Sequence, residues 1–308
     1  MTTVTSAATA TSRFVDAERT VLKRFAVTAE ERYLDLAEPR LRVRVLDSGD
    51  GPPVLLLHGM GSVAAFWAPL LGRLQGLHAI AVDRPGCGLS ESVDFRQLSL
   101  RPWSVQLIAA LVAALGYQRV SIIGNSIGGT MALWFAIERP DLVDRLVLIG
   151  APPFVLDLQA PLAMRIISVP FITHRIVAAN EPADIDRSFA RMGHPSGALG
   201  PELVELGMRS RDLPGYEHGF GGLLRSATGL MGRKVAATGQ ELAQLRAPTM
   251  LIWGAGDTHG PVATGRRMVS IMPDARLEVC GTGHLPWLDE PERCAALASE
   301  FLSAAGSR

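Results

Sequence analysis

The stretch Val120-Ser121-Ile122-Ile123-Gly124-Asn125-Ser126-Ile127-Gly128-Gly129 decides the fold, because it joins a short, mostly apolar run to a helical pattern through a glycine-rich turn. In a G-x-S-x-G turn the serine occupies a sharp, strained bend, and the flanking glycines lack the Cβ atoms that would clash across it. The stretch therefore predicts a buried strand, a sharp turn that holds Ser126, and a helix. A turn that only lets strand and helix pack closely is the alternative.

Similar apolar runs recur along the chain, at residues 54–57, 78–82, 120–123, 146–149, 250–253 and 277–279. Such continuous apolarity over a few residues is typical of a strand that is covered on both faces, as in a parallel sheet between helices. Helical patterns stand between the runs, at residues 65–74, 102–115, 127–138, 262–272 and 292–305. The alternation predicts an α/β protein with an open, mostly parallel, doubly wound sheet.

The alternation of apolar runs and helical patterns stops between residues 152 and about 240. Here prolines separate short helical segments, and no strand-like run occurs among them. We interpret this segment as a helical cap inserted after the sixth strand, over the sheet edge where ligands of open α/β sheets bind. The predicted core is then residues 14–151 and 241–308. Before it, residues 1–13 are expected to form a loose tail, residues 14–27 a short helix, and residues 32–36 and 41–46 two exposed-edge strands.

Composition excludes several classes of protein. Of 308 residues 48% are hydrophobic, which excludes a disordered chain, and 30 basic residues balance 30 acidic ones, which argues against a nucleic-acid partner. No window approaches the roughly 18 uninterrupted apolar residues of a membrane span, so we expect a cytoplasmic protein. The three cysteines are spaced neither for a disulfide framework nor for zinc, and buried or idle thiols are expected.

Two further side chains at predicted strand ends complete a candidate catalytic group with Ser126. Asp257 follows the run 250–253, and His284 follows the run 277–279. A serine needs a base to take its proton, and the imidazole needs a carboxylate to orient it. Alone, Asp257 could cap a helix and His284 could be incidental, but their joint occurrence in the order Ser, Asp, His predicts a triad.

Acyl transfer also needs donors for the developing oxyanion. The backbone N–H of Ile127, beside Ser126 at the start of a helix, is one candidate. The other lies in His58-Gly59-Met60-Gly61, where we favour the N–H of Met60 over that of Gly61. For the ring of His58, a structural hydrogen bond is favoured over a role as base.

At this point the chain resembles an α/β-hydrolase of the serine-esterase type. The resemblance is carried by five motifs in order: His58-Gly59-Met60-Gly61, Asp83-Arg84-Pro85-Gly86-Cys87-Gly88-Leu89-Ser90, Gly124-Asn125-Ser126-Ile127-Gly128-Gly129, Trp253-Gly254-Ala255-Gly256-Asp257 and Gly283-His284. It implies that the loop at Asp83 is structural. It also argues against haloalkane dehalogenases and epoxide hydrolases, which carry aspartate at the nucleophile position.

Within that family, the serine turn is similar to that of meta-cleavage-product hydrolases, which split a C–C bond in vinylogous diketones. Their oxyanion loop typically reads H-G-x-G-P-G, but Ser62 follows Gly61 here. They usually carry Trp directly after the catalytic His, but here Leu285 and Pro286 precede Trp287. Diketone cleavage therefore stays the alternative to ester chemistry.

The sequence thus predicts a serine hydrolase for a small to medium apolar ester or lactone, with an acyl-enzyme on Ser126 and no metal or organic cofactor. The expected pocket includes Gly59, Phe154, Phe220 and Leu285. Besides diketone hydrolysis, a lyase, a cofactor-free oxygenase and a small-molecule receptor remain open, since fold does not settle function. So does a homodimer formed through the cap.

Overall fold

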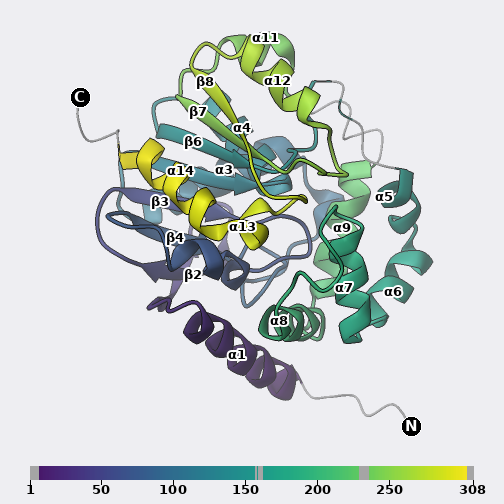
Figure 1. Cartoon of the computed structure of the whole chain (residues 1–308). Coiled ribbons are helices and arrows are strands. Elements are labelled where there is room, and N and C mark those ends of the chain that lie inside the picture. Colours follow the sequence, from purple (N-terminus) through teal and green to yellow (C-terminus); the bar gives the residue numbers. More distant parts are fainter. Residues whose placement is uncertain (1–6, 157, 159–161, 229–235, 304–308) are drawn as a thin grey trace.

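The computed structural model describes residues 7–156, 158, 162–228 and 236–303. Its strands form one eight-stranded sheet in the order β1-β2-β4-β3-β5-β6-β7-β8, with helices on both faces (Figure 1). The strands are β1 (Glu30–Leu36), β2 (Leu41–Ser48), β3 (Pro53–Leu57), β4 (His78–Val82), β5 (Val120–Asn125), β6 (Val143–Ile149), β7 (Thr249–Trp253) and β8 (Ala275–Val279). From β4 to β8 along this order all pairs are parallel, which confirms the predicted doubly wound sheet.

The apolar runs lie between two helical layers. The helices outside the segment between β6 and β7 are α1 (Ala7–Arg24), η1 (Ala64–Trp67), α2 (Ala68–Leu71), η2 (Phe95–Gln97), α3 (Leu100–Ala114), α4 (Ile127–Glu138), α12 (Val262–Ile271), α13 (Pro286–Asp289) and α14 (Pro291–Ser303). Leu55 and Leu57 of β3 belong to a core shared with α3 and α4, whereas Val54 and Leu56 belong to a core shared with α1, α2 and α14. Successive strand residues therefore fill opposite faces, as the pleat requires.

Between β6 and β7 the described residues form helices and no further strand of the sheet, although Val155 makes one isolated bridge with Ala237. The helices are α5 (Leu162–Ile167), α6 (Pro170–Ala178), α7 (Pro182–Ala190), α8 (Pro201–Arg211), α9 (Tyr216–Thr228) and α11 (Gly239–Ala243). Helices α5 to α9 gather beside the sheet (Figure 1). We refer to α5–α9 as the cap helices.

The N-terminal expectations need two corrections. The predicted loose tail is wrong for residues 7–13, which belong to α1, because the apolar positions Ala10, Phe14, Ala17 and Val21 repeat at helical spacing and are buried; residues 1–6 lie outside the described part. The second strand, β2, is not an edge strand, since it lies between β1 and β4 and has four consecutive buried residues.

The predicted last helix ends at Ser303, and residues 304–305 lie outside the described part.

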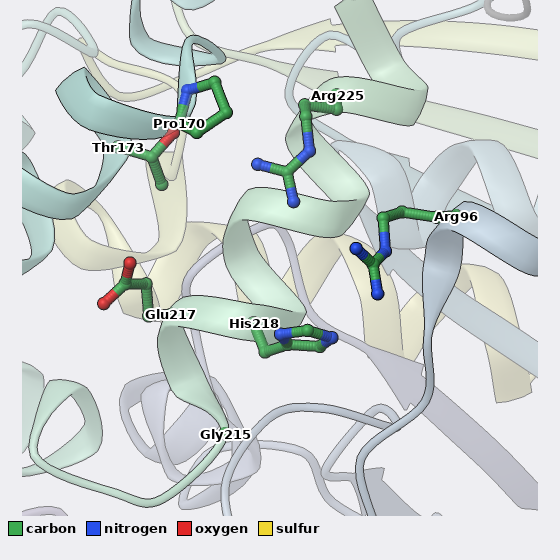
Figure 2. A pocket seen from close by; sticks show the side chains of 7 residues that line it. All are labelled: Arg96, Pro170, Thr173, Gly215, Glu217, His218 and Arg225. Carbon is green, nitrogen blue, oxygen red and sulfur yellow. The ribbon is translucent and has the colours of Figure 1, made fainter.

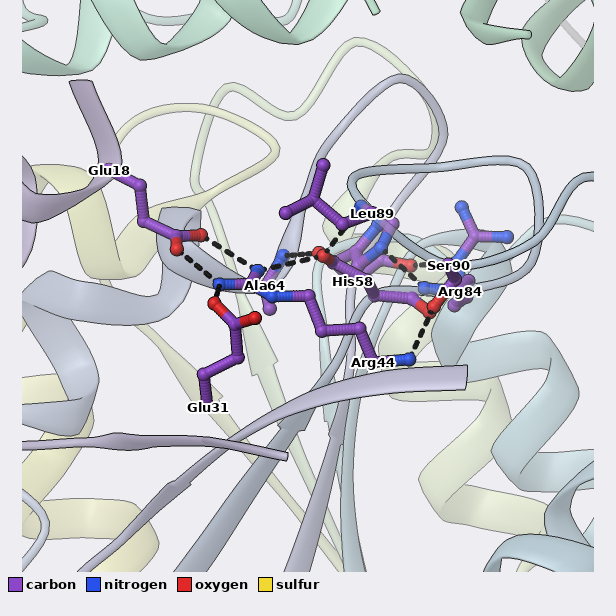
Figure 3. Close-up of polar contacts among 9 residues, drawn as sticks. Glu18, Glu31, Arg44, His58, Ala64, Arg84, Leu89 and Ser90 are labelled. Atoms are coloured by element: carbon purple, nitrogen blue, oxygen red, sulfur yellow. Dashed lines mark hydrogen bonds and ion pairs between the residues drawn. The ribbon is translucent and has the colours of Figure 1, made fainter. Parts of the chain in front are cut away.

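A buried charge network joins α1 to the sheet (Figure 3). Arg44 of β2 donates to Asp83 over 2.9 Å and to Glu18 of α1, and its side chain is 1% exposed. Asp83 also accepts from the backbone N–H of Ala64 and of Leu89. Burial would lower the pKa of Arg44, but the charges of Asp83 and Glu18 outweigh it and raise that pKa. The loop at Asp83 is therefore structural, as the resemblance implied.

All three cysteines are buried, which confirms the expected buried thiols. The sulfur atoms of Cys280 and Cys294 lie 3.4 Å apart. Among the described residues no helix is long and apolar enough to cross a membrane.

Candidate active site

Ser126 stands in a strained turn between β5 and α4. Its φ of 52° and ψ of −122° are rare for a residue with a side chain. The turn exists because glycines surround it: a Cβ on Gly128 would lie 2.1 Å from the carbonyl oxygen of Leu57, and one on Gly124 would lie 2.6 Å from the Cα of Gly129. The predicted strand–serine–helix geometry is confirmed.

Asp257 and His284 meet although 27 residues separate them. The Nδ1 of His284 lies 2.8 Å from Oδ2 of Asp257, and both side chains are almost fully buried. The Nε2 of His284 is buried and has no hydrogen-bond partner among the described residues. A carboxylate on Nδ1 leaves Nε2 as the nitrogen that can exchange a proton with another group.

The surroundings keep Asp257 ionised. Its Oδ2 accepts from the backbone N–H of Ala151 and its Oδ1 from that of His259, each over 2.8 Å. Burial would raise the pKa of Asp257, but the charge of His284 and these hydrogen bonds outweigh it and lower that pKa. An anionic Asp257 can orient His284 and stabilise its protonated form.

Asn125, the residue before Ser126, connects the serine turn to the histidine loop. Its Nδ2 donates to the carbonyl of Ile149 over 2.8 Å and to the carbonyl of His284 over 3.2 Å. The ends of β5, β6 and β8 are thereby held together next to Ser126. No hydrogen bond joins Ser126 to His284 among the described residues, and the connection between their segments runs through Asn125. Sequence reasoning quoted Asn125 in the motif but gave it no role.

A second imidazole lies on the first. The ring of His259 stacks on the ring of His284, with centroids 4.1 Å apart and planes 21° apart. Burial and the charge of His284 lower the pKa of His259 to about 3. His259 is therefore neutral near pH 7 and covers one face of His284. A lone histidine two residues after Asp257 carried no pattern that could have predicted this.

Asp257, His259 and His284 could also be considered as metal ligands, since their donor atoms lie within 4.8 Å of one another. Nitrogen lone pairs lie in the plane of an imidazole ring, and the two stacked rings aim theirs side by side rather than at one point. We therefore interpret the group as a proton-transfer site.

The loop after β3 lies against Ser126 and is fixed by Arg84. Arg84 donates from Nε to the carbonyl of His58 and from Nη2 to that of Gly59, each over 2.8 Å. A Cβ on Gly59 would lie 3.3 Å from the Cβ of Ser126. The backbone N–H groups of Met60 and Ile127 make no hydrogen bond among the described residues, which leaves both predicted donors available.

His58 has a structural role, as predicted. Its Nδ1 lies 2.8 Å from the carbonyl oxygen of Gly59, and its Nε2 accepts from the backbone N–H of Arg84 over 3.1 Å. Burial and the charge of Arg84 hold the pKa of His58 well below its usual value. Both ring nitrogens are therefore occupied, and the ring is no base.

The four predicted pocket residues occupy different places. Gly59 borders Ser126, and the ring of Phe220 lies near Gly61 in the same loop. Phe154 is 6% exposed and stacks on Trp134 of α4, so its ring belongs to the core. Leu285 is buried directly after His284.

The segment after α7 clamps the histidine loop, a connection that the sequence did not reveal. The carbonyl of Met192 accepts from the backbone N–H of His284 over 2.9 Å. The ring of His194 accepts from the N–H of Leu285 over 3.1 Å and lies 2.9 Å from a carboxylate oxygen of Asp289. We call His194 and Asp289, with these two bonds, the clamp pair.

Asp289 in turn supports the start of the histidine loop. Its Oδ2 accepts from the backbone N–H and the hydroxyl of Thr282. Burial would raise the pKa of Asp289, but the hydrogen bonds from His194 and Thr282 outweigh it and lower that pKa to about 2. A Cβ on Gly283 would lie 2.5 Å from the His194 ring, so the loop admits only glycine there without a rearrangement.

A strained serine turn between a buried strand and a helix of a doubly wound sheet is typical of the alpha/beta hydrolase fold. The chain belongs to the alpha/beta hydrolase family, whose model matches residues 54–297.

Three similar proteins illustrate the range. An uncharacterised protein of Mycobacterium tuberculosis is 28% identical, over 87% of this chain and 82% of its own length. A 2-hydroxy-6-oxononadienedioate/2-hydroxy-6-oxononatrienedioate hydrolase of Burkholderia vietnamiensis is also 28% identical, over 89% of this chain and 96% of its own. The crystal structure of carboxylesterase CesB from Bacillus subtilis superposes with a TM-score of 0.78 over 96% of this chain and 99% of its own, at 20% identity.

Proposed function

We propose that the protein hydrolyses a small to medium apolar carboxylic ester or lactone through an acyl-enzyme on Ser126. The observation that carries this proposal is the buried His284, bonded to Asp257 through Nδ1 and left with an unpartnered Nε2 beside the strained serine turn. A rotation of the serine hydroxyl toward Nε2 would complete the proton path.

In the proposed reaction Ser126 attacks the acyl carbon while His284 accepts the hydroxyl proton. The N–H groups of Met60 and Ile127 bind the oxyanion, and His284 then gives the proton to the leaving alcohol. Water, deprotonated by the same imidazole, attacks the acyl-enzyme. The bond to Ser126 then breaks, His284 returns the proton to the serine oxygen, and the acid is released. Asp257 orients His284 and stabilises its positive charge throughout.

Cleavage of a C–C bond in a vinylogous diketone is the second candidate. It is favoured by the Burkholderia relative, whose name describes such a hydrolase. Against it, Trp287 does not reach the site: its ring stacks on Trp67 with centroids 4.3 Å apart, and its Nε1 donates to the carbonyl of Phe66. The tryptophan expected beside the histidine of meta-cleavage-product hydrolases is thus a core residue here, and we place ester chemistry first.

The test compares p-nitrophenyl esters of increasing acyl length, lactones and ring-fission diketones as substrates. We expect ester turnover with an initial burst and a Ser126-linked acyl mass. Ser126→Ala should abolish both, whereas Ser99→Ala should not, because the Ser99 side chain makes no capping hydrogen bond. Turnover of diketones but not esters would favour the second candidate, and full ester activity in Ser126→Ala would refute both.

A further inference from the structure

Exposed large apolar side chains are concentrated on one part of the cap. Among the described residues, four of the five such side chains lie within ten positions of sequence, and the fifth is Tyr33 on β1. The four are Leu162 at 70% exposure, Ile166 at 50%, Val169 at 47% and Phe171 at 67%. We call these four residues, on and between α5 and α6, the α5–α6 surface. A contiguous exposed apolar patch marks an interaction site more often than single exposed residues do.

The charges on these two helices have one sign. Arg165 and Arg175 are exposed, and no Asp or Glu occurs from Leu162 to Asn180. Neither arginine has a carboxylate partner among the described residues, and the Arg175 guanidinium lies 5.7 Å from the ring centroid of Phe171. The α5–α6 surface is therefore apolar with a positive border.

A pocket of about 640 Å³ adjoins this surface (Figure 2). It is lined by Arg96, Pro170, Thr173, Gly215, Glu217, His218 and Arg225. Pro170 stands between Val169 and Phe171 in the chain, so the pocket begins where the apolar surface ends. The guanidinium groups of Arg225 and Arg96 extend into the same space (Figure 2).

Arg225 is a pocket cation without an ion-pair partner in the part of the chain that the structure describes. Arg96 is paired with Asp94 through two bonds of 2.8 and 2.7 Å, and Glu217 is engaged with His174. Arg225 is half-buried and has no carboxylate partner among the described residues. A guanidinium so placed favours a phosphate or carboxylate group of a ligand.

From these two features we propose that the α5–α6 surface docks on a lipid bilayer that contains anionic lipids, with an acidic headgroup bound by Arg225 in the adjoining pocket. The apolar side chains would enter the boundary between headgroups and acyl chains, and Arg165 and Arg175 would pair with headgroup charges. A second copy of this chain fits less well, because two such surfaces face to face would oppose arginines with arginines.

Docking there would bring the bilayer close to the candidate active site. Helix α9 carries Glu217, His218 and Arg225 on the pocket side, while Phe220 of the same helix lies near Gly61 of the oxyanion loop. The docking itself does not depend on the proposed hydrolysis, and Ser126→Ala should bind bilayers as the unmodified protein does.

The experiment measures co-sedimentation of the full-length protein with vesicles of phosphatidylcholine alone or mixed equally with phosphatidylglycerol. We expect binding to the mixed vesicles that weakens as salt is raised. Phe171→Ser should lower the partition coefficient about tenfold, and Arg225→Gln about fivefold, the latter only on anionic vesicles. Tyr33→Ser and Arg139→Gln are matched controls for an exposed aromatic and a surface arginine, and should leave binding unchanged.

Three outcomes would overturn the proposal. They are no sedimentation with mixed vesicles, equal binding to both vesicle types, and equal effects of the cap and control substitutions. A dimer in solution that Phe171→Ser dissociates, without vesicle binding, would instead assign the surface to a second copy. Ester turnover by the unmodified protein, measured without lipid, reports on the proposed reaction separately.

Discussion

Replacing His194 by Phe tests whether the clamp pair positions His284, the proposed catalytic base. The substitution keeps a buried aromatic ring but removes the hydrogen bond to Asp289 and the one from the Leu285 N–H. The partners of both lost bonds, Leu285 and Asp289, lie within five residues of His284. The hydrogen bond from the backbone N–H of His284 to the carbonyl of Met192 remains. The loop that carries His284 should then be held less firmly, and the imidazole should lose the fixed position that the proposed reaction needs.

The magnitude follows from the two bonds. A buried bond to a carboxylate contributes about 2 kcal/mol and a neutral one about 1 kcal/mol, so the free energy of unfolding should fall by about 3 kcal/mol. A misplacement of about 1 Å at a reacting group can cost about 100-fold in rate. We therefore expect kcat for a p-nitrophenyl ester to fall about 100-fold, with a much smaller change in KM.

Stability and positioning are separated by a second variant. Leu107 of α3 is fully buried in the core, and Leu107→Ala should cost about 3 kcal/mol of unfolding free energy without touching the site. Urea denaturation and steady-state kinetics on both variants, under conditions where each is folded, provide the comparison. Unchanged kcat in His194→Phe, or an equal loss in Leu107→Ala, would refute the positioning argument.

Three further substitutions test other ionisable side chains. Arg44→Met leaves Glu18 and Asp83 buried without their cation and should lower the free energy of unfolding by about 3 to 5 kcal/mol in urea titration; a loss under about 1 kcal/mol would contradict this reasoning. His259→Phe should weaken the dependence of unfolding free energy on pH in the acid range. The pKa of His259 is about 3 in the folded protein and 6.5 in the unfolded chain, so the unfolded chain takes up the proton first as pH falls, and the unmodified protein loses up to about 1.4 kcal/mol per pH unit between those values. Equal slopes in the two proteins would contradict this reasoning. Asp289→Asn should lower the free energy of unfolding by about 2 kcal/mol above pH 3.8, a contribution that the unmodified protein loses as pH falls to about 2. Thermal denaturation between these pH values should therefore show a loss of stability in the unmodified protein and none of this loss in Asp289→Asn.

Elements with a strong local pattern could be predicted from sequence. The predicted helix 127–138 has the observed bounds of α4, and the run 78–82 has those of β4. Nearly all residues of these two segments are apolar and buried, and burial leaves them little choice of structure. The meeting of Asp257 and His284 also followed from sequence, because parallel strands bring their carboxyl ends to one edge.

Other features needed the tertiary structure because their residues come from distant segments and follow no local pattern. The helix before residue 14 was missed since alanines at helical spacing resemble a loose small-residue tail until a core is seen to bury Ala10. The stacking of His259 on His284 and the place of Arg225 in the pocket beside the cap helices depend on loop and cap geometry rather than on any motif.

The sequence alone determined where the central strands lie in the chain and that they are buried, the glycine turn at Ser126, and the chemical types of the catalytic candidates. Hydrophobic periodicity and steric freedom act over a few neighbouring residues and so leave a local pattern. Which nitrogen of His284 is left open, what holds its loop in place and where the cap exposes apolar surface were decided only by tertiary structure. These properties depend on contacts between residues that are far apart in the chain. His194 and Asp289, for example, are separated by 95 positions and meet only in the folded protein.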